Sequence, residues 1–401
     1  MMIMNGLVSL IKQLKMKKVL FGIDQLLTKK NKLQQLRLAL VTNNAATTFK
    51  GEPGRVALIN KGFNITKLFS PEHGLTAQGE DGAYQNNSAD TITKLPVISL
   101  YGEQLMPTEE DLTDVDAVLF DIPDAGCRFY TYLWTMTYVM EVCAAYKKPL
   151  IILDRPNPIS GNLNLAEGPM LDEEHCHSFI GRWNIPVRHC CTLGELAKYF
   201  AATRVKDLDL ELIEVQNWNR EKTVTETSWF FAPPSPAICD FETAMLYPGM
   251  GLLEGINVNE GRGTIKPFKI MGSPWINAIQ LQKEFHSLHL PGLHTSVHSY
   301  TAAGGLYAGK ACHGLQFNIS DPFSFCPVQS GLRLIQLIAS LHPEHCEERL
   351  YVTRANPSGT GHLDKLTGVY HSFEKIKRNE LLATKVATTK WKEIIQSYLI
   401  Y

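Results

Sequence analysis

Short apolar runs alternate with longer amphipathic segments over the first half of the chain. Five of these runs are rich in β-branched or large apolar residues and end in polar side chains: 38–41, 65–69, 97–100, 117–120 and 150–153. Helix-like segments such as 54–61 and 129–147 lie between them. Continuous apolar strands that alternate with helices are typical of a parallel sheet covered on both faces. The pattern therefore predicts an α/β fold built on a mostly parallel sheet.

The rhythm changes after about residue 205. Segment 210–218 is expected to be the last strand of the first domain, and a proline-rich and then a glycine-rich stretch follow it. The elements predicted beyond are helices at 275–285, 328–341 and 380–401 and a strand at 313–319. The resulting division is a leading helix or tail at 1–18, a sheet domain at 19–225 and a smaller α+β domain at 226–401.

Composition and charge exclude two classes of partner. The 401 residues include 39 Lys and Arg against 40 Asp and Glu, which gives a formal net charge of -1. No window carries the run of basic residues expected of a nucleic-acid surface. No stretch approaches the roughly 18 uninterrupted apolar residues of a membrane-spanning helix. We therefore expect neither nucleic-acid binding nor membrane insertion.

The cysteines and the N-terminal segment bear on the compartment. Nine cysteines are scattered along the chain, an odd number without any CxxC pair, which favours free buried thiols. The first residues are basic and apolar, but Lys12 and Lys15 interrupt the apolar part and no small-residue cleavage site follows. The sequence thus favours a cytoplasmic protein. A periplasmic or secreted location is the alternative if a signal segment is missing from this sequence.

The end of the second apolar run carries the first candidate for chemistry. Residues 65–69 lead into Pro71, Glu72, His73 and Gly74. Ligands of open α/β sheets bind outside the carboxyl ends of the strands, and five successive strand ends are polar here. A carboxylic acid in a partly dry site can have its pKa raised into the range of a general acid. Glu72 is our candidate acid, with His73 beside it; a turn or a helix cap is the structural alternative.

Other strand ends and one glycine-rich loop supply further candidates. Segment 121–132 offers an arginine suited to a ligand carboxylate and tyrosine hydroxyls. Segment 154–158 is stiffened by two prolines, and segment 254–264 places polar groups on a permissive backbone, as ligand-facing loops do. The candidates are Asn43, Arg128, Tyr130, Asp154, Asn157, Glu254, Asn257, Glu260 and Arg262. A local ion pair, a rigid turn and a mobile surface loop are the structural alternatives for these segments.

Motifs for several other chemistries are missing. The chain has no G-x-G-x-x-G, no G-x-x-x-x-G-K-[ST] and no G-x-S-x-G. His175, His177, His342 and His345 have some metal-ligand character, but no spacing matches a structural zinc site. We therefore expect no metal and no cofactor. A metal-dependent hydrolase and a non-catalytic sugar-binding protein remain the alternative functions.

The chain resembles the exo-acting β-N-acetylmuramidase family of bacterial peptidoglycan turnover in motifs that occur in the family's order: TNN, SPEHG, SLYG, DIPDAGCRFYTY, DRPNP, PPSP, YPG and EGINVNEGRGTIKPF. The resemblance begins near Gly22 and runs to the C-terminus. It implies a Rossmann-like N-terminal domain, a smaller C-terminal domain and an active site in the cleft between them. It also implies removal of terminal N-acetylmuramic acid (MurNAc) from the non-reducing end of MurNAc-GlcNAc fragments, where GlcNAc is N-acetylglucosamine. We expect a monomer or homodimer.

The resemblance also implies roles for single residues. The glutamate of the family's PEHG motif, proposed as catalytic, falls on Glu72. A glycosidase needs a proton donor and usually a second carboxylate, for which Asp154, Glu254 and Glu260 are candidates; the substrate's own acetamido group is an alternative.

Substrate binding and departures from the family pattern complete this picture. MurNAc carries a lactyl carboxylate, which Arg128 and Arg262 are expected to bind. The chain departs from the usual family pattern at Ala77, Pro123 and Ile256, where glycine, glutamine and threonine are common.

Overall fold

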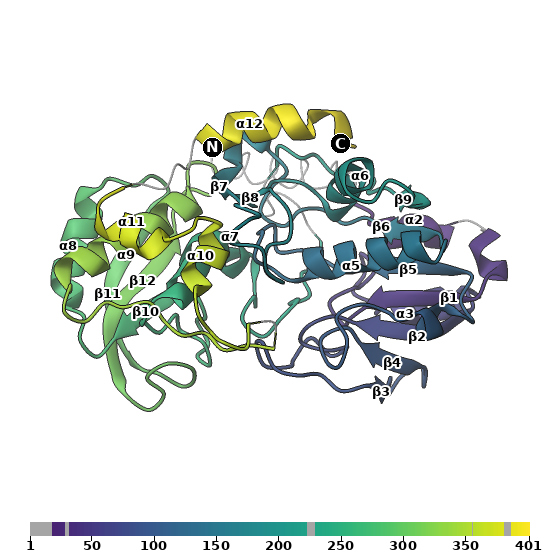
Figure 1. Cartoon of the computed structure of the whole chain (residues 1–401), viewed down its shortest axis with the longest axis horizontal. Helices are drawn as coiled ribbons and strands as arrows, with labels where there is room; N and C mark the ends of the chain where they lie inside the picture. Colours follow the sequence, from purple (N-terminus) through teal and green to yellow (C-terminus); the bar gives the residue numbers. More distant parts are fainter. Residues whose placement is uncertain (1–17, 29–31, 223–228, 355, 381–385) are drawn as a thin grey trace, which may run out of the picture.

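Seven strands form the sheet of the first domain, in the order β3-β4-β2-β1-β5-β6-β9 (Figure 1). Their bounds are β1 Leu38–Thr42, β2 Ile65–Ser70, β3 Ser88–Ala89, β4 Pro96–Ser99, β5 Ala117–Asp121, β6 Leu150–Leu153 and β9 Leu210–Ile213. All neighbouring strands pair in parallel except the short β3, which is antiparallel to β4. The five predicted strands, the last strand and the mostly parallel sheet are confirmed.

The computed structural model describes residues 18–28, 32–222, 229–354, 356–380 and 386–401. The leading helix or tail predicted at 1–18 lies outside this part of the chain except for its last residue. The boundary predicted between 225 and 226 also lies outside it.

Both faces of the sheet are buried, which explains why its strands read as continuous apolar runs. Along β1, Ala39 and Val41 belong to one apolar core, and Leu38 and Leu40 belong to the other. The helices of this domain are α2 Gly22–Thr28, α3 Gly54–Asn60, α4 Glu109–Leu112, α5 Tyr132–Ala145 and α6 Leu193–Thr203, with η1 Lys32–Gln35 and η2 Leu163–Leu165 as 3-10 turns. Strands β7 Glu167–Met170 and β8 Pro186–Arg188 pair in antiparallel orientation and form a separate two-stranded sheet. Because both faces of the sheet are covered, a ligand can reach it only at the ends of its strands, and in open α/β sheets ligands bind at the carboxyl ends.

The second domain contains a three-stranded antiparallel sheet in the order β10-β12-β11. Its elements are α7 Phe241–Met250, η4 Gly251–Gly255, β10 Ile270–Ser273, α8 Ala278–Ser287, β11 Leu293–Thr301, β12 Ala311–Ile319, α9 Pro327–Leu341, α10 His362–Thr367 and α11 Ser372–Lys377. The predicted helices at 275–285 and 328–341 and the strand at 313–319 are confirmed as α8, α9 and β12. The smaller α+β domain is therefore confirmed as well.

The last helix returns to the first domain. Helix α12 Val386–Ile395, followed by η5 Gln396–Tyr398, lies beside β7, β8 and α6 (Figure 1). Trp391 of this helix is fully buried, and its indole N–H donates a hydrogen bond of 2.9 Å to the carbonyl of His189. Residues that the sequence analysis assigned to the second domain thus help to close the core of the first.

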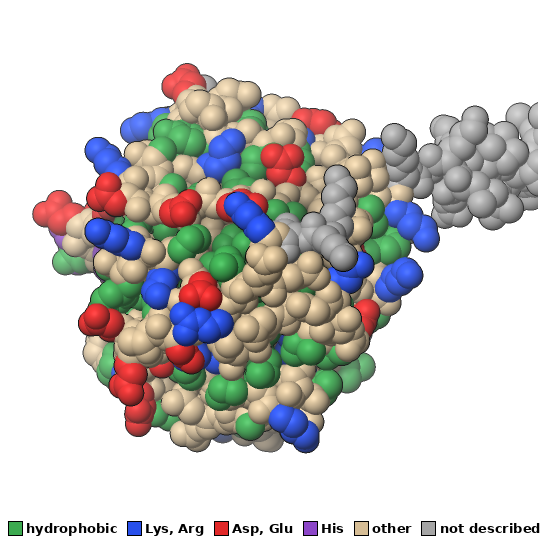
Figure 2. Space-filling model, turned by 90° about the vertical axis from the view of Figure 1, so that its right-hand side faces the viewer, with side chains coloured by type: hydrophobic (Ala, Val, Ile, Leu, Met, Phe, Trp, Pro, Cys, Tyr) green, Lys and Arg blue, Asp and Glu red, His purple; other side chains and the backbone are tan. Residues whose placement is uncertain are grey.

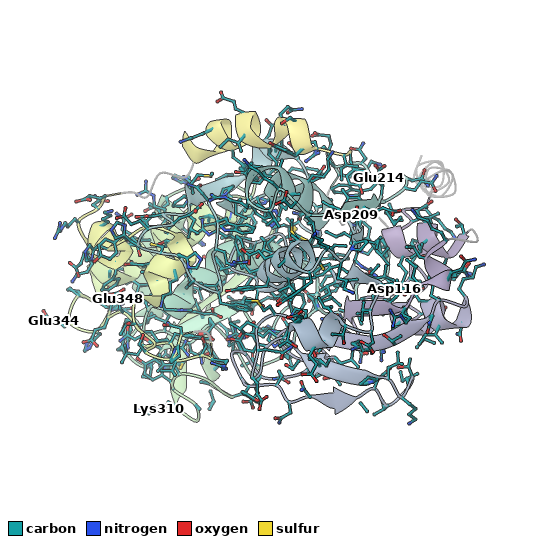
Figure 3. The ribbon with its side chains drawn as sticks, turned by 45° about the vertical axis from the view of Figure 1, so that its right-hand side comes forward. Asp116, Asp209, Glu214, Lys310, Glu344 and Glu348 are labelled. Carbon is teal, nitrogen blue, oxygen red and sulfur yellow. The ribbon has the colours of Figure 1, made fainter. Side chains whose placement is uncertain are left out.

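The surface mixes charges of both signs. Acidic and basic side chains are interspersed over the face shown in Figure 2. Asp209 of the first domain is exposed, as are Lys310 and Glu344 of the second, which lie at the outside of the molecule in Figure 3. Among the described residues, no helix combines the length and the apolar character needed to cross a membrane.

Candidate active site

A pocket between the two domains opens where β2 and β5 end. It encloses about 690 Å³, including the solvent at its mouth. The first domain contributes the segment after β2, with Glu72, His73 and Asp81, and the residues that lead into α5; the second domain contributes Glu254 and Arg262 among others. The predicted cleft between the domains is therefore present, and the strand-end glutamate lies in its wall.

Glu72 is buried at the point where β2 has just ended. Its side chain is 5% exposed. The hydroxyl of Thr131 donates to Oε2 over 2.7 Å, and the backbone N–H of Gly82 donates to Oε1 over 2.8 Å. The element that follows β2 is the strand β3, so Glu72 does not cap a following helix. Burial raises the pKa of Glu72, and the charge of Asp81 adds to the rise, while His73 and the two hydrogen bonds act against it.

His73 stands next to Glu72 on a strained stretch of backbone. Its φ is 66°, in the left-handed region that non-glycine residues rarely adopt, and Ala77 follows with φ 59°. The resemblance implies a glycine at Ala77, which this backbone conformation favours. Nδ1 of His73 lies 2.8 Å from the carbonyl oxygen of Gly79, so Nδ1 carries the proton and Nε2 remains for a ligand.

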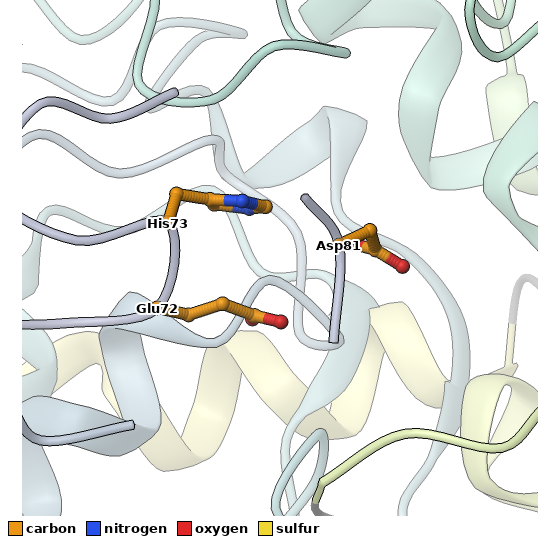
Figure 4. Close-up of side chains that lie close together, drawn as sticks. All are labelled: Glu72, His73 and Asp81. Atoms are coloured by element: carbon orange, nitrogen blue, oxygen red, sulfur yellow. The ribbon is translucent and has the colours of Figure 1, made fainter. Parts of the chain in front are cut away.

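Asp81 completes a group of three side chains. Glu72, His73 and Asp81 each offer a ligand atom, and these atoms all lie within 4.8 Å of one another (Figure 4). A guanidinium nitrogen of Arg262 lies 3.4 Å from Asp81, and the hydroxyl of Tyr351 donates to the same carboxylate. The side chain of Asp81 is 29% exposed. Its partial desolvation opposes ionisation, but Arg262, His73 and Tyr351 outweigh this effect and lower its pKa. Two neighbouring carboxylates thus have pKa values shifted in opposite directions.

The glycine-rich loop of the second domain anchors the far wall. Arg262 pairs with Glu254 and, at 3.1 Å, with Glu260. Glu260 is buried and also pairs with Arg349 at 3.1 Å. Glu254 lies 3.9 Å from an imidazole nitrogen of His362. Glu254, Arg262 and His362 line the pocket, whereas Glu260 lies behind them and supports the loop.

Arg128 does not line this pocket, although the sequence analysis made it a candidate for a ligand carboxylate. Its side chain is fully buried, and its guanidinium donates to the carbonyls of Pro169, Ile185 and Leu366 over 2.8–2.9 Å. Burial lowers its pKa to about 10. Arg128 therefore joins the first domain to α10 and lies outside the wall of the pocket.

Replacing Arg128 with methionine should lower the free energy of unfolding by about 2–4 kcal/mol, because three buried carbonyls lose their donor. The exposed Arg378 offers a control, since Arg378→Met should change stability by less than about 0.5 kcal/mol. Urea denaturation measures both. Unchanged stability together with a raised KM would restore a ligand role for Arg128.

Four other predicted site residues do not line the pocket, and their side chains bond to groups of the protein itself: Asn43, Asp154, Asn157 and Asn257. Asp154 accepts hydrogen bonds from Thr192, Gly194, Arg155 and Tyr401, and burial raises its pKa to about 6. It joins β6 to α6 and the C-terminus.

The three asparagines among them shape turns and support other side chains. Asn157 bonds to Cys191 and Ile159, and Asn257 bonds to His345 and Glu347. Asn43 donates to the hydroxyl of Tyr132, which in turn lies 3.2 Å from the carbonyl of Glu72. The structure therefore places these four residues outside the wall of the pocket that contains Glu72.

Five predicted residues do line one pocket: Glu72, His73, Tyr130, Glu254 and Arg262. The sequence analysis missed Asp81, Tyr351, His362 and Lys365, which line it too. Asp81 lies nine positions after Glu72 in a loop that contains glycines. A carboxylate in such a loop so close to Glu72 could have been recognised as a further candidate from the sequence. The other three lie in or next to a polar loop of the second domain, whose sequence shows no motif.

Comparisons with known proteins agree with this arrangement. The family model for the N-terminal domain of the exo-beta-N-acetylmuramidase NamZ matches residues 38–242, and the model for its C-terminal domain matches residues 245–401. The two models therefore meet near residue 243. The peptidoglycan beta-N-acetylmuramidase NamZ of Bacillus subtilis strain 168 is 38% identical over 385 residues, which cover 95% of this chain and 87% of that protein.

Solved structures show the same fold. Two proteins of the DUF1343 family from Bacteroides fragilis NCTC 9343 match with TM-scores of 0.82 and 0.73 and sequence identities of 27% and 25%. Each match covers 96% of this chain and 99% of the other. Since family models match both domains and a relative is 38% identical along nearly the whole chain, the protein belongs to the exo-β-N-acetylmuramidase NamZ family.

Proposed function

We propose that this protein is a glycoside hydrolase that removes terminal β-linked MurNAc from the non-reducing end of peptidoglycan fragments. Membership of the exo-beta-N-acetylmuramidase family supports the substrate, and the Bacillus subtilis relative is a peptidoglycan beta-N-acetylmuramidase. The observation that carries the proposal is the pair of carboxylates in the pocket, Glu72 with a raised pKa and Asp81 with a lowered one. When the pKa values of two carboxyl groups are shifted in opposite directions, one can stay protonated and act as the acid while the other stays ionised and stabilises positive charge.

The roles follow from these protonation states. Protonated Glu72 donates its proton to the glycosidic oxygen, the bond from that oxygen to C1 breaks, and the GlcNAc hydroxyl leaves. Ionised Asp81 faces the positive charge that develops at C1. Glu72, now a carboxylate, then accepts a proton from the water that attacks C1. A carboxylate oxygen of Glu72 lies within 4.8 Å of one of Asp81. This separation is closer to the roughly 5 Å between the two carboxyl groups of retaining glycosidases than to the wider separation in inverting ones.

A pair of chromogenic substrates tests this function. The protein should release nitrophenol from nitrophenyl β-N-acetylmuraminide and much less from the matching glucosaminide, which lacks the lactyl group. Tight binding of the muraminide without any release would favour the sugar-binding alternative. Comparable release from both would exclude recognition of MurNAc.

A metal-dependent hydrolase is the second candidate, because the group of Glu72, His73 and Asp81 could also hold a divalent cation. The two candidates differ in their response to chelation. If the carboxylates perform acid and base catalysis directly, prolonged dialysis against EDTA should leave kcat within about twofold of the untreated protein. A loss of activity that zinc or magnesium restores would support the metal-dependent alternative.

A further inference from the structure

Two cations that are charged at neutral pH line the pocket within the described part of the chain, Arg262 and Lys365. They matter because MurNAc differs from GlcNAc by a lactyl ether, whose carboxylate is ionised at neutral pH when no peptide is attached. A buried or half-buried anion is bound best by a cation that has a free donor and no carboxylate partner of its own. The two cations differ in this respect.

Arg262 is already surrounded by carboxylates. Its guanidinium contacts Glu254, lies 3.1 Å from Glu260 and lies 3.4 Å from Asp81. An incoming anion would meet repulsion from these acidic groups in a site of reduced dielectric. Arg262, which the sequence analysis favoured for the lactyl carboxylate, is thus better suited to organising the acidic wall of the pocket.

Lys365 has only neutral acceptors. Its ammonium donates to Oδ1 of Asn356 over 2.7 Å and to the carbonyl of Thr360 over 3.0 Å. No carboxylate of a described residue lies within ion-pair distance of it; Glu254, in the wall of the same pocket, pairs with Arg262 and His362. An ammonium has three donors, so one remains for a ligand. The charge of the adjacent Asp364 favours the charged form of Lys365, but its carboxylate accepts hydrogen bonds from His371 and Ser372 and forms no ion pair with Lys365. Burial lowers the pKa of Lys365, and a bound anion would offset that cost.

The position of Lys365 is fixed by both domains. It lies on α10, and the carbonyl of the next residue, Leu366, accepts a hydrogen bond from Arg128 of the first domain. The same pocket contains Glu72. We propose, on the basis of the function above, that Lys365 binds the lactyl carboxylate of MurNAc and so selects this sugar over GlcNAc. If this is correct, the protein should prefer MurNAc with a free lactyl carboxylate to MurNAc in which a peptide has converted that carboxylate into an amide.

Two substrates and three variants test the proposal. The substrates are nitrophenyl β-N-acetylmuraminide with a free lactyl acid and the same compound as its lactyl carboxamide. Lys365→Gln should raise KM for the acid by about 10- to 100-fold and change KM for the carboxamide by less than about threefold. Lys365→Arg keeps the charge and should retain most of the preference for the acid. Lys310→Gln, at the exposed end of the β11–β12 connection, is the control and should change neither KM (Figure 3).

The wild-type protein gives a test that needs no variant, since its KM should be lower for the acid than for the carboxamide by a similar factor. Equal KM values in the wild type, or an equal loss on both substrates in Lys365→Gln, would overturn the role of Lys365. If the wild type hydrolyses neither substrate, the proposed function fails instead. Calorimetric titration with free MurNAc then decides the role of Lys365: weaker binding in Lys365→Gln supports it, and unchanged binding overturns it.

Discussion

Replacement of Glu72 by glutamine is expected to lower kcat by about 10²- to 10⁴-fold, the usual contribution of a general acid. Glutamine keeps the shape of the side chain but has no acidic proton to give to the glycosidic oxygen. Its carbonyl can accept from Gly82, and its amide can donate to the hydroxyl of Thr131, which rotates to accept. KM should therefore change little, and the free energy of unfolding should change by about 1 kcal/mol or less.

Steady-state kinetics together with urea denaturation separate a catalytic role from a structural one. Glu344→Gln is the matched control, because Glu344 is an exposed carboxylate at the outside of the second domain (Figure 3). It should leave both kcat and stability unchanged. A Glu72→Gln variant that loses several kcal/mol of stability but keeps its kcat would make Glu72 a structural residue.

Replacement of Asp81 by asparagine should have the second-largest effect, a loss in kcat/KM of about 10²- to 10³-fold, as expected when a charge that stabilises the transition state is removed. It should also shift the pH profile. The charge of Asp81 raises the pKa of Glu72, so its removal lowers that pKa. Because the reaction needs protonated Glu72, the decline of kcat/KM on the alkaline side should then begin at a lower pH.

The pH dependence of kcat/KM, measured for the wild type and the variant, tests this effect. Asp209→Asn serves as a control, since Asp209 is exposed and does not line the pocket. Its profile should coincide with that of the wild type. An alkaline limb that stays in place or moves to higher pH in Asp81→Asn would show that Asp81 does not act on Glu72 as described.

The sequence predicted the sheet and Glu72 for the same physical reason. Strands buried on both faces are continuously apolar, so β2 can be located from its residues, and the polar side chain after its end must lie at the edge of the sheet. That argument gives the position of a residue and not the direction of its side chain. Arg128 and Asp154 also follow strands, yet both turn into the protein and bond to its own groups. Residue type and strand ends alone could not distinguish them from Glu72.

The second domain shows a further limit of the sequence analysis. Strand β11 was not predicted, because it combines few buried side chains, such as Leu293 and Thr295, with exposed polar ones. Lys365 lies on a helix of six residues after a polar loop, too short for an amphipathic pattern to be visible. Its place in the pocket depends on tertiary contacts between the domains, such as the bond from Arg128 to Leu366. Such contacts leave no periodic signal in the chain.

The dependence of the Glu72→Gln deficit on the leaving group tests the central claim most directly. The ratio of wild-type to variant kcat is measured on MurNAc-GlcNAc and on nitrophenyl β-N-acetylmuraminide in parallel. A sugar alcohol is a poor leaving group and needs protonation, whereas nitrophenolate leaves readily without it. If Glu72 is the general acid, the ratio should be larger on the disaccharide by at least about tenfold. An equal ratio on both substrates, or full activity of Glu72→Gln on the disaccharide, would contradict that role.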